Sequence, residues 1–148
     1  MAVTIHMYSK FPLTVLTDKL GDLSGETTLK CLLCTSSYTP NQDAHDYHAD
    51  ITNEVAAAGN YSTGGEILTS TTVATAARVM TFDAADTQWT SSTITARYAV
   101  IYDYTGGSSA TNALVCYVDF GENKISENGT FKIQWNASGI FTVTVAAG

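Results

Sequence analysis

Apolar and polar side chains alternate strictly near the end of the chain. Only a β-strand places all the apolar side chains of such a pattern on one face, where they can be buried together. Residues 130–135 alternate in this way, and residues 141–145 repeat the pattern after the turn-forming residues 136–139. A period of two residues places all the apolar side chains of a strand on one face. The pattern predicts a short-looped antiparallel hairpin with one buried face, and it assigns Trp135 to the core.

Strand-like segments also cover much of the rest of the chain, with turn residues at intervals of roughly ten. We expect strands at residues 28–35, 67–73, 78–82, 88–90, 94–103 and 113–120, and Asn128-Gly129 is a further turn signal. Short strands in this number predict an all-β fold, an antiparallel β-sandwich or jelly roll, as a single domain over residues 28–148. Residues 1–27 are predicted to form an N-terminal arm or a short helix with Pro12 in its first turn.

The segment 94–103 is the strongest of these strands. It carries apolar residues on both faces, so we expect it to be central in its sheet. Uninterrupted alternation places one set of side chains on one face and the intervening residues on the other. The first set is Ile94, Ala96, Tyr98, Val100 and Tyr102.

The low content of charged residues argues against several classes of binding partner. Charged residues make up 14% of the 148 residues, the net charge is −7, and Ser and Thr together number 35. Hydroxyl side chains suit the solvent-exposed faces of strands. With five Lys and two Arg, the chain has no basic stripe for nucleic-acid phosphates or for an anionic membrane surface. We therefore expect no nucleic-acid partner and no membrane partner.

Neither a targeting segment nor a disulfide framework is expected from the sequence. The first ten residues lack a basic region followed by an apolar core. The apolar runs fall well short of the roughly twenty residues of a membrane-spanning helix. Three cysteines are an odd number for a disulfide framework. These features predict a chain made in a reducing cytoplasm.

Cys31 and Cys34, followed by His45 and His48, have the chemistry of a zinc site but not its spacing. The interval between the two pairs is shorter than in zinc fingers, and so is the interval between the histidines. A strand also places the two thiols on opposite faces, whereas zinc knuckles present both from a tight turn. Buried cysteines that pack as small apolar residues are therefore the favoured interpretation.

The acidic residues Asp43, Asp46, Asp50 and Glu54 offer the oxygen ligands that calcium prefers. The EF-hand pattern is absent, and a solvated segment rich in capping residues is favoured. The sequence also has no Gly-x-Ser-x-Gly motif, phosphate-binding glycine loop or other organised catalytic group. We therefore predict that the chain is not an enzyme and binds no metal or other cofactor.

Several aromatic residues are expected in loops, where exposed rings can stack on sugars. They are Trp89, Tyr38, Tyr47 and Tyr61. The competing interpretation, which is favoured, is that the tyrosines pack against the body with their hydroxyls at the surface.

Three stretches of the chain carry a resemblance to a known family. They read LCTSSYTPNQDAHDY at 33–47, running on to DITNEV at 50–55; TITARYAVIY at 93–102; and YVDFG at 117–121, followed by GTFKIQWN at 129–136. In that order, and over residues 6–145, the chain resembles a family of small virion proteins of tailed bacteriophages. The family has no catalytic motif to transfer.

This resemblance implies a capsid decoration (cement) protein, a non-enzymatic component on the outer surface of the phage head. Its expected partners are the major capsid protein and copies of itself, as a trimer or dimer. Its expected location is the virion, after synthesis in the cytoplasm of the bacterial host. The alternative, from a different class, is a receptor- or glycan-binding module of a phage fibre or tail.

Attachment is expected through the N-terminal segment and neighbouring loops. Few lysines are present to block strand addition at sheet edges, which favours assembly into an oligomer or onto a lattice. For Phe11 and Leu16 the equal alternative is packing on the chain's own sandwich. The candidate contact residues are Tyr8, Phe11 and Leu16 in the first segment and His45, Asp46 and Tyr47 in the loop.

Overall fold

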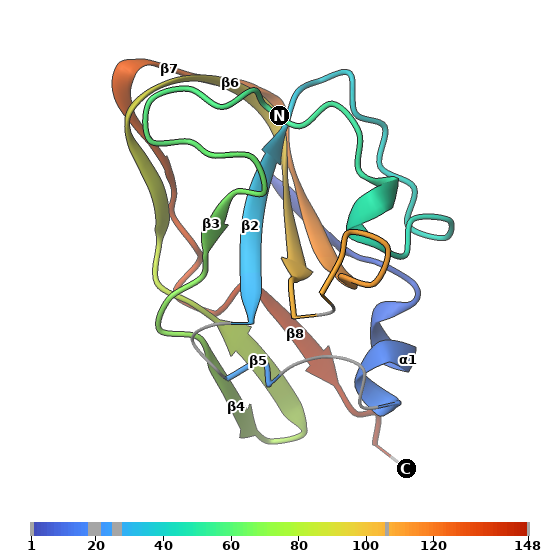
Figure 1. The fold of residues 1–148 in the computed structure, drawn as a ribbon. Helices are drawn as coiled ribbons and strands as arrows, with labels where there is room; N and C mark the ends of the chain where they lie inside the picture. The colour runs from blue at the N-terminus through green and yellow to red at the C-terminus, as the bar shows by residue number, and fades with distance from the viewer. Residues whose placement is uncertain (1, 18–21, 25–27, 106, 148) are drawn as a thin grey trace.

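Two antiparallel sheets form the body of the protein. The computed structural model describes residues 2–17, 22–24, 28–105 and 107–147. Within these residues a five-stranded sheet has the order β1-β7-β6-β2-β3, and a three-stranded sheet has the order β4-β5-β8 (Figure 1). The predicted all-β antiparallel fold is confirmed and is consistent with a sandwich. The jelly-roll alternative is not confirmed.

We call the five-stranded sheet the main sheet and the three-stranded sheet the small sheet. The helix α1 covers Phe11–Leu16, and the short 3-10 turn η1 covers His48–Asp50. The main sheet contains β1 (Thr4–Met7), β7 (Leu114–Ile133), β6 (Thr87–Asp103), β2 (Leu29–Cys34) and β3 (Glu66–Ile67). The small sheet contains β4 (Thr72–Ala76), β5 (Val79–Asp83) and β8 (Phe141–Thr144).

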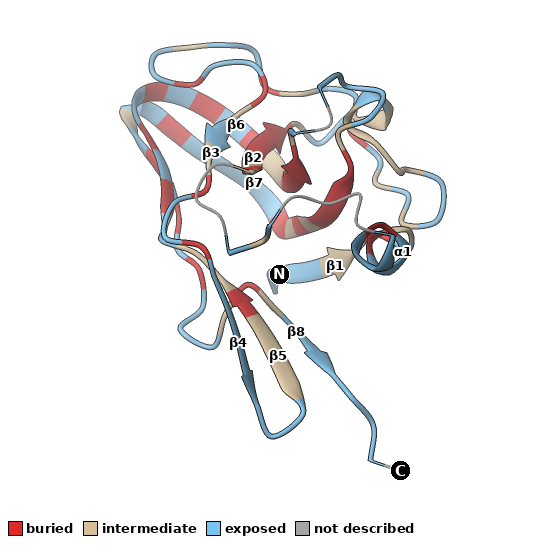
Figure 2. Cartoon of the chain, turned by 60° about the horizontal axis from the view of Figure 1, so that its bottom comes forward, coloured by how far each residue is buried: buried red, intermediate tan, exposed pale blue. Residues whose placement is uncertain are grey.

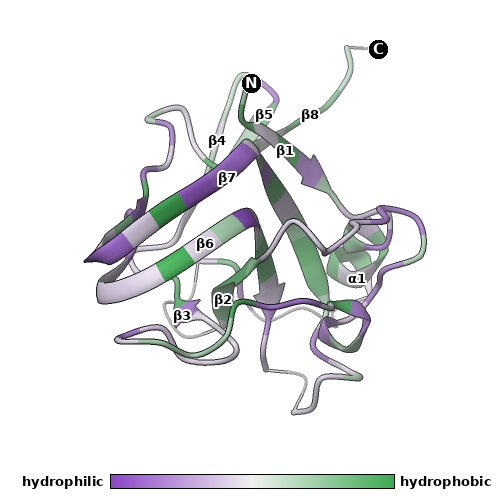
Figure 3. Cartoon of the chain, turned by 90° about the horizontal axis from the view of Figure 1, so that it is seen from above, coloured by the Kyte–Doolittle hydropathy of each residue, from purple (hydrophilic) through white to green (hydrophobic). Residues whose placement is uncertain are grey.

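Two long bent strands, β6 and β7, replace four of the predicted short ones. The expected strands at 88–90 and 94–103 are both parts of β6, and β7 contains residues 114–120 and 130–133 of the other two. Their pairing is irregular around Ser92, and both Ser91 and Asn128 have positive φ. The turn signal at Asn128-Gly129 thus marks a bulge, which bends a strand without ending it. The two strands carry alternating bands of hydropathy along their outer parts (Figure 3).

The alternation predicted for residues 94–103 is wrong in its second half. Ile94 and Ala96 lie in the same core cluster as Ala99 and Ile101, while Tyr98, Val100 and Tyr102 belong to a second cluster. The register between β6 and β7 shifts between Ala96 and Tyr98. A bulge of this kind turns the following side chains to the opposite face. The prediction that this segment is central is confirmed, because β6 lies between β7 and β2.

The predicted C-terminal hairpin is also wrong. Residues 131–133 pair with β6, and β8 pairs instead with β5 in the small sheet. The turn at 136–139 redirects the chain, and the Ile140 N–H donates to the Phe82 carbonyl at 2.8 Å. Phe141 then packs on Phe82 at a ring-centroid distance of 5.1 Å. Burial of aromatic surface in this new environment decides between two pairings that local alternation permits equally.

The expected strand at 67–73 divides between the two sheets. Residues 66–67 form β3, and residues 72–76 form β4. Between them Leu68 is buried and Ser70 has φ 52°, a left-handed conformation that ends the extended backbone. The predicted strands at 28–35 and 78–82 are confirmed as β2 and β5.

The core consists of two clusters on opposite sides of the main sheet. The larger one joins the two sheets, since Phe82 of β5 lies in it together with Leu33 and Ile101. The smaller one contains Leu32 and Val100 and lies on the other side. Cys31 belongs to the larger cluster and Cys34 to the smaller, so the two thiols lie on opposite faces of β2, as predicted.

The N-terminal segment contributes both an edge strand and the predicted short helix. Residues 4–7 form β1, which pairs with β7 at the edge of the main sheet. The helix α1 follows, with Pro12 in its first turn, where a missing N–H costs no helical hydrogen bond. Residues 1, 18–21 and 25–27 of this predicted arm lie outside the described part of the chain.

Candidate interaction surface

The small sheet extends from one end of the body and is largely open to solvent. All five residues of β4 are exposed, and three of the four residues of β8 are exposed (Figure 2). Only Phe82 is buried in β5, although that strand is central in the sheet. A sheet of this kind normally covers at least one face. In this protein both faces of its outer part are uncovered.

One side of the small sheet is markedly more apolar than the other. Directly paired residues point to the same side of a sheet. The register pairs Val73 with Phe82 and Met80 with Val143. We call this side the apolar face, and it consists of Val73, Thr75, Met80, Phe82, Phe141 and Val143.

The apolar face is continuous with the protein core at its inner end. Phe82 is fully buried, and Phe141 contacts Phe11 of α1 edge-on at a centroid distance of 5.6 Å. Val73, which pairs with Phe82 but lies on the edge strand, is 38% exposed. Toward the turn between β4 and β5, Val143 is 38% exposed and Val145, just beyond β8, is 64% exposed. The same layer of side chains therefore runs from the core into solvent, a feature typical of an interaction site.

The helix α1 adds a second group of exposed apolar side chains. Its buried residues are Phe11 and Thr14, which face the body. Leu13, Val15 and Leu16 point outward, and Leu16 is 84% exposed. The helix contains no charged residue. A six-residue helix with solvent-exposed leucine and valine side chains is stabilised when a partner buries those side chains.

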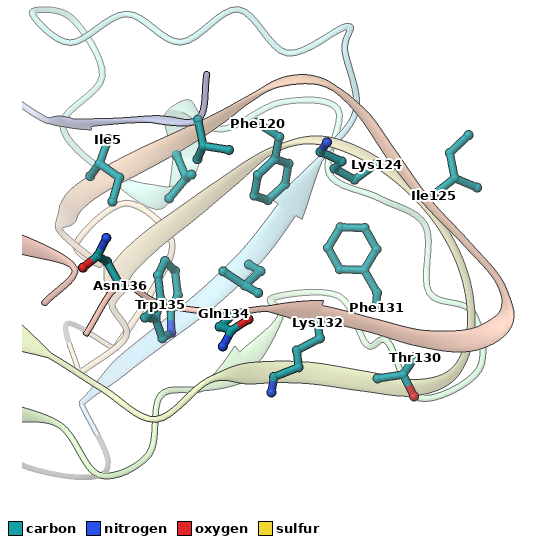
Figure 4. A pocket seen from close by; sticks show the side chains of 13 residues that line it. Ile5, Phe120, Lys124, Ile125, Thr130, Phe131, Lys132, Gln134, Trp135 and Asn136 are labelled. Carbon is teal, nitrogen blue, oxygen red and sulfur yellow. The ribbon is translucent and has the colours of Figure 1, made fainter. Parts of the chain in front are cut away.

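A groove of about 570 Å³ lies where β7 curls back beside β1 (Figure 4). Phe120 and Phe131 point into it from two parts of β7, and Trp135 closes one end. Ile5 of β1 and Ile125 of β7 lie along its rim and are both exposed. The lining is mostly apolar, so the groove suits an aliphatic or aromatic segment more than a charged ligand.

The structure brings several predicted contact residues together at the junction of the N-terminal segment and loop 41–50. Lys10 pairs with Asp46 at 2.8 Å, and its ammonium lies 4.5 Å from the centroid of the Tyr47 ring. The bond to Asp46 raises the pKa of Lys10. Ser9 donates to Asp43 at 2.5 Å. The segment and the loop therefore form one surface, in which Asp46 and Tyr47 are half-buried.

Tyr8, Tyr38 and His45 form a hydrogen-bonded chain beneath this surface. The two hydroxyls lie 2.9 Å apart, and the Tyr38 hydroxyl lies 3.0 Å from His45 Nδ1. Burial raises the pKa of both tyrosines, so they stay protonated and serve as structural hydrogen-bonding groups. Tyr8 and Phe11 are thus buried, and Phe11 packs on the chain's own body, as the alternative interpretation predicted. Of the three candidate contact residues in the first segment, Leu16 alone is exposed.

Three of the four aromatic residues considered for sugar stacking are buried, as the favoured packing interpretation predicts for the tyrosines, although the hydroxyls of Tyr38 and Tyr61 are buried too. Trp89, Tyr38 and Tyr61 are each 1% exposed, and Tyr47 is half-buried beside Lys10. Trp89 lies on β6, and its ring packs on Tyr61 at a centroid distance of 5.5 Å. The Tyr61 hydroxyl accepts from the Leu33 N–H and donates to Glu54. These rings are held in the core by contacts between distant segments and present no sugar-stacking platform.

The acidic residues of loop 41–54 act as caps and hydrogen-bond acceptors. Asp50 accepts from the backbone N–H groups of Tyr47 and Asp46, and these bonds lower its pKa. Glu54 accepts from the Gly64 N–H at 2.6 Å. Across the residues that the structure describes, no three His, Cys, Asp or Glu side chains gather as a metal site would require.

The thiols and imidazoles of the predicted zinc alternative lie in separate environments. His48 stacks on the Tyr102 ring at 4.5 Å, and its partial burial lowers its pKa. Cys31, Cys34 and Cys116 are free and buried. Their surroundings are apolar, so these cysteines contribute to packing.

Comparison of the chain with known proteins identifies no relative. No protein-family model, curated protein or solved structure matches the chain. Among the described residues, no helix is long and apolar enough to span a membrane.

Sequence reasoning missed the exposed small sheet. Residues 71–77 read TTVATAA, which contains no charged residue, Pro or Gly. That composition is itself a signal, because natural edge strands usually carry Lys, Pro or a bulge. The pairing of β8 with β5, which completes this sheet, has no signal in the local pattern.

Proposed function

We propose that this chain is a non-enzymatic structural protein of a bacteriophage virion, a capsid decoration protein that binds the outer surface of the head. The observation that carries the proposal is the uncovered apolar surface on the small sheet and α1. Val145 and Leu16 are 64% and 84% exposed there, and the layer is continuous with the core through Phe141 and Phe11. Exposed apolar surfaces that continue the core are typical of interaction sites.

The rigid all-β body supports this role. A protein that reinforces a shell has to keep its shape under load, and its contacts have to come from surfaces held by that shape. Here β6 and β7 are 17 and 20 residues long and cross the whole body. They connect the groove at one end to the fully buried centre of the main sheet. Force at the surface is therefore transmitted through continuous strands.

The charge of the protein suits the outside of a shell. The net charge of −7 gives no attraction to packaged DNA, and the contact surfaces on α1 and β4 carry no charge at all. Association through neutral apolar surfaces is insensitive to salt.

The partners in this proposal are the major capsid protein and other copies of this chain. Leu16 on α1 is the leading head-contact candidate from the first segment. Asp46 and Tyr47, which contact Lys10 at the start of that helix, are the candidates from the loop. His45 supports the same loop from below through Tyr38. Tyr8 and Phe11 act indirectly, because they hold α1 and β1 against the body.

Sedimentation with phage particles tests the proposal. Purified chain is mixed with empty heads that lack it, and in parallel with isolated tails of the same phage. We expect the chain to pellet with heads and to stay in the supernatant with tails. Binding to tails alone would overturn the proposal in favour of a fibre or tail module, and binding to neither would overturn it outright.

A pair of variants locates the contact. Leu16→Asp places a charge on the exposed apolar side of α1, and we expect it to reduce head binding at least tenfold. Thr95→Asp introduces the same charge at an exposed position of β6 and serves as the matched control. Equal binding by both variants would remove α1 from the contact surface. Single-particle imaging of decorated heads then identifies the position and number of bound copies.

A further inference from the structure

The strand β4 is a free edge of the small sheet. Within the described chain it pairs only with β5, and all five of its residues are exposed. Figures 1 and 2 both show open space on its outer side. Such an edge presents unpaired backbone N–H and C=O groups, which an added strand can satisfy.

The turn between β4 and β5 determines which backbone groups are unpaired. Ala77 and Arg78 form a two-residue turn, and both have positive φ, as a type I′ hairpin requires. In such a hairpin the residues that flank the turn, Ala76 and Val79, are a hydrogen-bonded pair. Alternate residues then bond to β5. Val73 and Thr75 therefore direct their N–H and C=O groups toward the open edge.

The usual protection against strand addition is absent from this edge. Residues 72–76 include no lysine, proline, glycine or charged side chain, and their pairing with β5 is regular. The strand has high β propensity on the side of Val73 and Thr75. Without protection, an edge of this composition pairs with another strand when one of matching chemistry is present.

We propose that β4 pairs antiparallel with β4 of a second copy about a two-fold axis at Ala74, which joins the two small sheets into one six-stranded sheet. This deepens, and rests on, the self-association included in the proposed function. The second copy is the occupant because the edge is complementary to itself. Val73 of each copy lies opposite Thr75 of the other, and both direct their free N–H and C=O groups across the interface.

The side chains fit the same register. Val73 and Thr75 of the second copy form a β-branched pair on the apolar face, and Ala74 meets its own symmetry mate on the other face. Thr72 lies opposite Ala76 of the second copy, and no residue of β4 is charged, so no like charges face each other across the axis.

The other edge of the small sheet is less suited to this role. Phe141 at the start of β8 packs on Phe11, so α1 lies beside that strand. Pairing of β8 with β4 of another copy would also be head-to-tail, and such contacts lead to open filaments unless a ring closes. Pairing of β4 with β4 closes after two copies.

Sedimentation velocity tests the interface with purified chain and no phage component. We expect wild-type protein at about 100 μM to sediment as a dimer, at twice the monomer mass of 15.8 kDa. Thr75→Lys places like charges beside the axis and is expected to give a monomer with unchanged circular dichroism. Thr144→Lys makes the same change at an exposed threonine of β8 and is expected to remain dimeric. A monomeric wild-type chain, or a dimer unaffected by Thr75→Lys, would overturn the proposal.

Cross-linking tests the register. Opposed residues at the axis form a non-hydrogen-bonded pair with Cα atoms about 4.5 Å apart, a separation that a disulfide spans. Ala74→Cys is therefore expected to give a covalent dimer on mild oxidation under native conditions, where the three natural cysteines are buried. Ala76→Cys is the matched control, because its two copies lie far from the axis. Equal cross-linking of both variants would contradict the register.

The outcome separates this proposal from the proposed function. A chain that dimerises through β4 but binds no phage heads would overturn the capsid role and leave the interface intact. A chain that binds heads while Thr75→Lys changes neither its mass in solution nor its binding would overturn the interface and leave the capsid role intact.

Discussion

Arg97 and Asp119 form a bidentate ion pair at the point where the register between β6 and β7 changes. Arg97 Nε lies 2.7 Å from Asp119 Oδ1, and Nη2 lies 3.2 Å from Oδ2. Between Ala96 and Tyr98, β6 advances by two residues while β7 advances by five, from Lys124 to Asp119. Asp119 also accepts from the Gly121 N–H at 2.7 Å within this bulge. The pair therefore joins the two strands at the point where their side chains change faces.

Asp119→Asn tests the role of this pair through pH. The Arg97 guanidinium, together with the Gly121 N–H, lowers the pKa of Asp119 in the folded protein. The stabilisation is therefore complete above the unfolded pKa of about 4 and is lost as the pH falls through the folded value. We expect the variant to have a lower melting temperature than wild type at pH 7. The difference should shrink as the pH falls below the unfolded pKa, and calorimetry over a pH series measures it. A constant difference would show that the charge of Asp119 is not responsible.

Leu33→Ala tests the core assignment of β2. Leu33 is fully buried in the larger cluster. Removal of a buried leucine side chain costs about 2–5 kcal/mol, depending on how far the cavity collapses. Leu16→Ala is the control, because Leu16 is 84% exposed and its truncation should change stability by less than about 0.5 kcal/mol. Urea denaturation of both variants checks the contrast. Similar losses would contradict the burial pattern.

Gly65→Ala tests a close approach of two backbones. A Cβ at Gly65 would lie 1.9 Å from the Cys31 carbonyl oxygen, and the residue has φ +72°. Gly107 has φ +88° but nothing within 4 Å of a built Cβ. Both changes incur backbone strain of about 1–3 kcal/mol, and only Gly65→Ala adds a clash with β2. We expect Gly65→Ala to lower the melting temperature much more than Gly107→Ala. Equal melting temperatures would contradict this geometry.

The three cysteines are expected to be inert in the folded protein. Burial raises the pKa of Cys31 and Cys34 and raises that of Cys116 to about 12. The thiolate is the reactive form, so a thiol reagent should find no fast-reacting group at neutral pH. All three should react in guanidinium. Ala49→Cys, at an exposed position of η1, is the positive control and should react at once. Fast reaction of a natural thiol in native protein would contradict the burial of these side chains.

The fold class follows from the sequence because strand periodicity is a local property. The buried strand at 28–35 and the central strand at 94–103 were predictable, since apolar residues on both faces have to be covered on both sides. The faces on which the side chains after Arg97 lie were not predictable. The bulge at 119–124 depends on contacts of Asp119 with Arg97 and Gly121, which lie on different strands or across a turn.

The candidate surface was predictable only in part. Asp46 and Tyr47 lie beside the start of α1 because both contact Lys10, whereas Leu16 is at the other end of that helix. Tyr8 and Phe11 are buried there instead, since an aromatic residue beside a sheet gains more from packing than from exposure. Trp89 is likewise drawn inward by Tyr61, which lies far from it in the sequence.

The sequence by itself determined an antiparallel all-β protein with little charge, hydroxyl-rich strand faces and free cysteines on opposite sides of β2. These properties depend on side-chain period and composition, which each segment carries alone. Only the tertiary structure decided that β8 pairs with β5 in the small sheet and not with β7, and that β4 is an unpaired edge of that sheet. The reason is that alternation specifies which face of a strand is buried, whereas its partner is chosen by aromatic packing between distant segments, here Phe82, Phe141 and Phe11.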